Sequence, residues 1–124
     1  MSEATIVIDE NEARIRFKGD AERYAEPKHD SYLKWLAAGV SILDKNLDTK
    51  TYLKGEKTTI LIQMPDEWGT HSAPGIKYAM YDLINNGMLA DWYDSRGSDK
   101  AKRYRQGAEL NKAQIQSIIN SIDK

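Results

Sequence analysis

A helix made from residues 72–96, SAPGIKYAMYDLINNGMLADWYDSR, would have almost no side left for water, and this constrains the fold more than any other feature. With about 100° between successive residues, one face collects Ile76, Ala79, Met80, Leu83, Gly87 and Ala90. The opposite face collects Tyr78, Tyr81, Met88, Leu89 and Trp92. Tyr, Trp and Met are typical of surfaces that another protein covers. The segment therefore predicts one of two arrangements: a helix sandwiched inside one monomer, or an aromatic face covered by a second subunit.

The length of 124 residues fits a single domain, 1–124, that buries its own core. We expect residues 1–29 to form a hairpin and connector arm, and residues 30–124 a helical core with an inserted strand at 58–64. The net charge of -1 excludes a surface built throughout for nucleic acid or anionic lipid. The chain has no cysteine, which excludes disulfides and thiolate metal sites. It has no signal-like start and no membrane-length apolar run, so we expect no membrane contact.

The expected fold class is α+β and mainly helical: a helix bundle with a short N-terminal β-hairpin and one additional strand. Residues 5–8 and 13–17 have strand character on either side of a polar turn, with Ala13, Ile15 and Phe17 alternating with charged residues. Residues 19–29 are polar and contain a proline, which predicts a connector. Asp30 can cap an amphipathic helix over 30–47. We expect 48–57 to be a loop and 58–64 a strand that pairs with the hairpin.

The last third of the chain is expected to be helical after a loop at 66–71. Ser72 is a plausible cap for the long helix, with Pro74 in its first turn. Residues 96–98 break that helix, and 99–106 predict one or two further helical turns before Gly107 interrupts. Asn111 can cap a final helix whose narrow apolar stripe consists of Ile115, Ile118, Ile119 and Ile122.

The sequence contains no constellation that calls for catalysis. His29 and His71 fall in predicted loops near acidic residues, but their spacing matches no metal-ligand or general-base motif, so solvation or capping is the preferred interpretation. We therefore expect a noncatalytic protein with no catalytic residues, no metal site and no cofactor. An enzyme with a site near His71 and Asp66 is kept as a third alternative, because loops can assemble sites that a sequence hides.

A basic segment at 96–105 is the main alternative functional feature. Its cations could contact phosphates while Tyr93 and Tyr104 stack on bases, which is the pattern of a small nucleic-acid-binding accessory protein. A solvated helix face or an acidic protein partner explains the same segment more simply. The candidate nucleic-acid contacts are Lys100, Lys102, Arg103 and Arg105.

The end of the long helix carries a Trp-Tyr-x-x-Arg pattern, from Trp92 through Tyr93 to Arg96, preceded by Ala79 and Leu83. Together with the acid-capped helix at 30–47, this pattern resembles the small head-tail connector, or head-completion, proteins of tailed bacteriophages. The resemblance covers roughly half of the chain.

The resemblance implies a phage or prophage virion structural protein, made in the bacterial host cytoplasm. It implies a homo-oligomeric ring of about a dozen copies that binds the portal protein and a tail or stopper protein. DNA would pass through the channel without specific binding, which suits the faintly acidic charge balance. The expected subunit-interface residues, with the last two fixing the helix end, are Tyr78, Tyr81, Met88, Leu89, Trp92, Tyr93 and Arg96.

Overall fold

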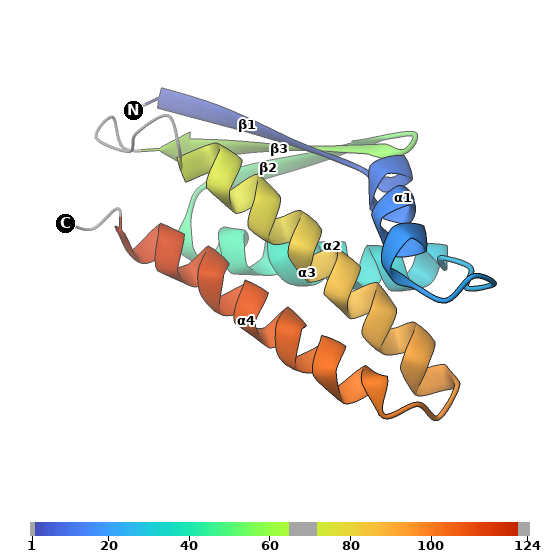
Figure 1. Ribbon diagram of the computed structural model, residues 1–124. Coiled ribbons are helices and arrows are strands. Elements are labelled where there is room, and N and C mark those ends of the chain that lie inside the picture. Colours follow the sequence, from blue (N-terminus) through green and yellow to red (C-terminus); the bar gives the residue numbers. More distant parts are fainter. Residues whose placement is uncertain (1, 65–71, 122–124) are drawn as a thin grey trace.

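The computed structural model describes residues 2–64 and 72–121, and their arrangement is shown in Figure 1. Four helices lie below a three-stranded antiparallel sheet in that view, and no described helix lies above it. The elements in chain order are β1 (Ser2–Asp9), α1 (Glu10–Asp20), α2 (His29–Asn46), β2 (Thr49–Lys54), β3 (Lys57–Met64), α3 (Ser72–Ser95) and α4 (Lys100–Asn120). The predicted class, mainly helical α+β, is confirmed.

The sheet has the order β1-β3-β2, so β3 is central and pairs antiparallel with both neighbours. The predicted strand at 58–64 is thus confirmed with one added residue, and it pairs with the N-terminal strand as expected. Strand β3 alternates buried and partly exposed side chains, which is the pattern of a sheet with one covered face. The covered face contributes Ile6, Ile8, Ile60 and Ile62 to a single hydrophobic core shared with the helices.

The predicted second arm of an N-terminal hairpin is wrong, because residues 13–17 belong to helix α1. The alternation of three apolar residues also fits a helix, since Ala13 and Phe17 are four residues apart and both are buried. Ile15, between them, is 63% exposed. Asp9 accepts a hydrogen bond from the Asn11 backbone N–H and caps the helix. The predicted polar turn is therefore a helix start.

The hairpin of this protein is β2–β3, and the loop predicted at 48–57 is wrong. Its two-residue turn begins with Gly55 at a φ of 63°, a conformation that glycine adopts without steric cost. Five of the six residues of β2 are exposed. A strand exposed on both faces needs no alternating apolar residues, so its sequence carries no strand periodicity.

Two helix boundaries also differ from expectation. Helix α2 starts at His29 with Lys28 as its N-cap, so Asp30 lies within the first turn and does not cap it. Helix α4 continues through Gly107, where an added Cβ would lie 2.9 Å from the Asn86 amide nitrogen of α3. The glycine therefore permits close helix packing and does not end the helix. Asn111 is buried inside α4, with its amide 2.7 Å from that of Asn86.

Helix α3 is the centre of the molecule, in contact with α1, α2, α4 and β1. Its neighbours approach closely: an added Cβ at Gly87 would lie 2.1 Å from the Trp35 ring of α2. On another side, the Tyr81 hydroxyl accepts a hydrogen bond from the Asp9 backbone N–H of β1 at 2.8 Å. On a third side, Ile115 and Ile119 of α4 are buried, as their stripe predicted, while Ile122 lies outside the described residues.

Substituting Gly87→Ala tests the close contact between α2 and α3. The added methyl group would force the Trp35 ring to move, so we expect the free energy of unfolding to fall by about 1–3 kcal/mol. The matched control is Gly19→Ala in α1, where an added Cβ meets no heavy atom within 4 Å and a small gain of roughly 0.5–1 kcal/mol is expected. Urea unfolding measures both, and equal effects would contradict the packing described.

Candidate interaction surfaces

Four of the predicted interface residues lie inside the monomer, so their assignment to a subunit interface is wrong. Tyr81, Met88, Leu89 and Tyr93 are each at most 3% exposed. The sequence left open whether the last helix or a second subunit covers this face. In the structure α1 and β1 cover Tyr81 and Trp92, through Arg16, Phe17 and the Asp9 backbone, and α4 covers Tyr93. The alternative of a sandwiched central helix is the arrangement found.

The other three predicted interface residues keep some surface. Tyr78 is 62% exposed near the start of α3, Trp92 is partly buried and Arg96 is exposed beyond its end. The Arg96 guanidinium lies 4.4 Å from the centre of the Trp92 ring, and the ring also packs edge-on against Phe17. The Trp-Tyr-x-x-Arg pattern therefore contributes contacts within the chain at the end of α3.

A cleft of about 560 Å³ opens where α1, the start of α2 and the second half of α3 meet. Phe17, Met88 and Trp92 supply apolar walls, and His29, Ser31, Lys34 and Asp91 are among the polar residues. Met88 and Trp92 come from the aromatic face that the sequence singled out. The cleft is thus where part of that face reaches the surface.

Asp91 holds the polar side of the cleft together. Its carboxylate accepts hydrogen bonds from Ser31 Oγ at 2.6 Å and Trp35 Nε1 at 2.9 Å, and it also pairs with Lys34 Nζ at 3.0 Å. Burial alone would raise the pKa of Asp91, but the bonds from Ser31, Trp35 and Lys34 outweigh it and hold that pKa below its ordinary value. The carboxylate is therefore ionised at neutral pH and ties α2 to α3.

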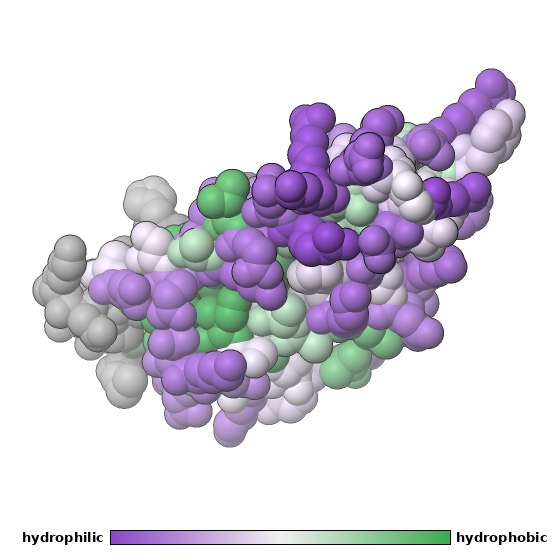
Figure 2. Space-filling model, turned by 90° about the horizontal axis from the view of Figure 1, so that it is seen from below, coloured by the Kyte–Doolittle hydropathy of each residue, from purple (hydrophilic) through white to green (hydrophobic). Residues whose placement is uncertain are grey.

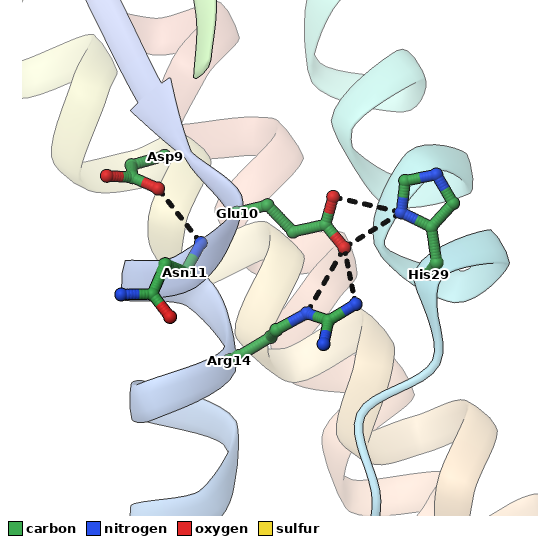
Figure 3. A network of polar contacts seen from close by, with 5 residues as sticks. All are labelled: Asp9, Glu10, Asn11, Arg14 and His29. Carbon is green, nitrogen blue, oxygen red and sulfur yellow. Dashed lines mark hydrogen bonds and ion pairs between the residues drawn. The ribbon is translucent and has the colours of Figure 1, made fainter. Parts of the chain in front are cut away.

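A second polar network joins α1 to the start of α2, and Figure 3 shows its central carboxylate between a histidine and an arginine. His29 Nδ1 donates to both oxygens of Glu10, at 2.9 and 2.8 Å, and Arg14 Nε and Nη2 donate at 3.2 and 3.0 Å. The Glu10 side chain is only 8% exposed. Its backbone N–H donates to the Glu56 carbonyl, which anchors the β2–β3 turn.

These networks were not predicted from the sequence. Glu10 was assigned to a turn, and only its spacing of four residues from Arg14 indicated a helical ion pair. Its contact with His29 spans 19 residues and leaves no local pattern.

Burial raises the pKa of the neighbouring Tyr32 to about 12, with a smaller contribution from the Glu10 charge, so its hydroxyl keeps its proton. Within 2–64 and 72–121, no group of three His, Cys, Asp or Glu residues could hold a metal ion.

The two tyrosines of the basic segment contact each other. Tyr93 and Tyr104 stack at 5.6 Å with an angle of 9° between their rings, and Tyr93 is 3% exposed. Lys100 lies 5.3 Å from the Tyr93 ring centre and Arg103 lies 5.9 Å from that of Tyr104. Arg105 pairs with Asp94 at 3.3 Å. The structure thus leaves exposed cations at this end of the molecule and a buried Tyr93 ring beneath them.

No described helix covers the upper side of the sheet in Figure 1. Strand alternation places there the side chains of Glu3, Thr5, Val7, Thr59, Leu61, Gln63, Lys50 and Tyr52. A shallow hollow of about 320 Å³ lies among several of them. On β2, Tyr52 is 55% exposed on this face, and Leu53 is 68% exposed on the other. The face seen in Figure 2, from below, is mostly hydrophilic, with a smaller hydrophobic area toward one end.

Comparison of the chain with protein-family models, with curated proteins and with solved structures finds no match. Among the described helices, none has an apolar stretch that could cross a lipid bilayer. The third alternative, a site near His71 and Asp66, lies outside the described residues.

Replacing Asp91→Asn tests the network at the cleft. We expect a loss of about 1–3 kcal/mol in the free energy of unfolding at pH 7, because hydrogen bonds to a charged acceptor are weakened. Since the folded-state pKa of Asp91 is lowered, this stabilisation is present above the unfolded pKa of about 4 and is lost as the pH falls through the lower folded value. The free energies of unfolding of the parent chain and of Asp91→Asn should therefore converge in acid.

The matched control is Asp94→Asn, an exposed carboxylate three residues further along α3. It should change stability little at either pH, because exposed ion pairs contribute at most about 1 kcal/mol. Chemical unfolding at a series of pH values measures the difference. A deficit of Asp91→Asn that is the same at pH 7 and pH 3 would contradict the network as described.

Proposed function

We propose that this protein is a noncatalytic structural subunit of a phage or prophage particle, and that it contacts its neighbours through its sheet. The observation that carries this proposal is the sheet, which has one face that no described helix covers and an edge strand that exposes Tyr52 and Leu53. Exposed apolar side chains on an edge strand favour pairing with another chain. In this proposal the sheet makes the subunit contact that was predicted for the aromatic face of the long helix.

The kind of particle comes from the resemblance to head-tail connector proteins. In that role the subunit would form a closed ring of about a dozen copies, with the portal protein on one side and a tail or stopper protein on the other. The helix pair that carries the resemblance corresponds to α2 and α3. The Trp92 to Arg96 pattern would then stabilise the end of α3, since Arg96 packs on Trp92.

The two carboxylates in and beside the cleft also support a noncatalytic role. Glu10 is held by His29 and Arg14, while Asp91 is held by Ser31, Lys34 and Trp35. Both carboxylates therefore have donors from the chain itself, which suits structural bonds between helices better than proton transfer to a substrate.

Light scattering of the purified protein, alone and mixed with a portal protein, tests the proposed function. We expect a mass well above that of the 14.1 kDa chain in at least one of the two samples, with the mass rising with concentration. A monomer that keeps its mass at high concentration and with portal, tail and stopper proteins would contradict the proposal.

A nucleic-acid-binding accessory protein is the second candidate, and the start of α4 favours it. Lys100, Lys102 and Arg103 occupy its first turn, which contains no acidic residue. The positive end of the helix dipole adds to these charges and would attract phosphate groups. In this version the contact is electrostatic only, because the tyrosines are occupied.

The triple variant Lys102→Ala, Arg103→Ala, Arg105→Ala separates the two candidates. If the second candidate holds, affinity for duplex DNA falls steeply with salt and drops at least tenfold in this variant. The matched control removes three distant cations, Lys18, Lys45 and Lys54, and should keep most of the affinity. Fluorescence anisotropy measures both, and equal losses in the two variants would reject a site at 100–105.

A further inference from the structure

We propose that the sheet continues from one copy of the chain to the next, with the outer edge of β2 paired to the outer edge of β1 of the neighbouring copy. This inference rests on the proposed assembly function and names its contact. The two edges lie on opposite sides of β3. A contact between different edges is heterologous, so repeating it gives a closed ring or an open filament.

The register shows which backbone groups of β2 point outward. The Gln63 N–H donates to the Asp48 carbonyl at 3.0 Å, which makes these two residues a hydrogen-bonded pair. Because such pairs alternate along an antiparallel ladder, Lys50 and Tyr52 also bond to β3. The N–H and C=O groups of the intervening residues therefore face away from β3; they are Thr49, Thr51 and Leu53.

The backbone groups of β1 that face away from β3 follow from its hydrogen bonds in the same way. The Glu10 N–H donates to the Glu56 carbonyl at 2.9 Å, so the even-numbered residues of β1 bond to β3 and the odd-numbered residues face outward. At the end of the strand, the outward N–H of Asp9 is already bonded to the Tyr81 hydroxyl. Three residues remain with outward groups, Glu3, Thr5 and Val7, and they match the three of β2.

Charge selects the pairing of unlike edges. Strand β2 carries two cations, Lys50 and Lys54, whereas β1 carries two carboxylates, Glu3 and Asp9, and no cation. A contact between two β2 edges would bring together strands of the same positive charge, and a contact between two β1 edges strands of the same negative charge, which is unfavourable in both cases. Only the β2–β1 contact brings opposite charges together. The occupant of the β2 edge is therefore a second copy of this chain.

The exposed apolar residues of β2 fit this contact as well. Strands β1 and β2 are parallel, since both are antiparallel to β3. If the sheet continues at the same level, the register sets the partly exposed Val7 of the next copy beside Tyr52. Aromatic and β-branched neighbours on one face of a sheet stabilise each other. The exposure of Tyr52 in one copy is then explained by what it contacts in the assembly.

Thr51→Pro tests the edge itself. Proline removes the outward N–H of Thr51 and leaves the ladder to β3 intact, because the hydrogen-bonded residues are its neighbours. We expect self-association, measured by light scattering over a concentration series, to weaken at least about tenfold. The control Thr51→Val keeps the N–H and should associate like the parent chain. Circular dichroism checks that each variant is folded.

A charge exchange provides a test that does not depend on proline. Lys50→Glu should weaken association, because the register sets residue 50 diagonally from Glu3 of the next copy, and adding Glu3→Lys should recover it by restoring opposite charges there. An assembly that survives Thr51→Pro and shows no recovery in the exchange would overturn the β2–β1 contact and leave the assembly function standing. A parent chain that is monomeric alone and with virion proteins would overturn both.

Discussion

Burial of helix α3 by its own chain is the constraint on which the rest of the structure depends. A helix of 24 residues that is apolar around most of its circumference cannot be left in water. Helices α1, α2 and α4 and strand β1 each cover part of it. The Tyr81 hydroxyl receives the Asp9 N–H, so a large aromatic side chain is buried without an orphaned oxygen. Because the described helices lie on one side of the sheet, none of them covers its other face.

The sequence predicted the elements whose apolar residues recur with a clear helical period, and the strand that is a run of β-branched residues. Helices α2 and α3 and strand β3 lie within one or two residues of their expected bounds, and the isoleucines of α4 face the core. Helix α1 was missed because a spacing of four between Ala13 and Phe17 also satisfies a period of two. Strand β2 was missed because a strand exposed on both faces has no reason to alternate. Gly107 was taken as a break because the close approach of Asn86 is a property of the packed helices.

The candidate surfaces were harder to predict than the fold, and the reasons are physical. The aromatic face of α3 was correctly recognised as needing a cover, but composition does not tell whether another part of the chain or another subunit covers it. The bond between Glu10 and His29 joins two segments that only the fold brings together. The open sheet is a consequence of where all the helices lie, so no single segment of the sequence indicates it.

Assembly through the sheet accounts for the exposed edge residues and the unlike charges of the two edges, and it leaves the burial of most of α3 to its own chain. Amide hydrogen exchange of the parent chain, compared between dilute and concentrated solutions, tests it most directly. The account predicts that the outward amides of Thr51 and Leu53 on β2, and of Thr5 and Val7 on β1, become protected on concentration while α3 stays unchanged. Edge amides that exchange equally fast in both solutions, or new protection confined to α3 and α4, would contradict it.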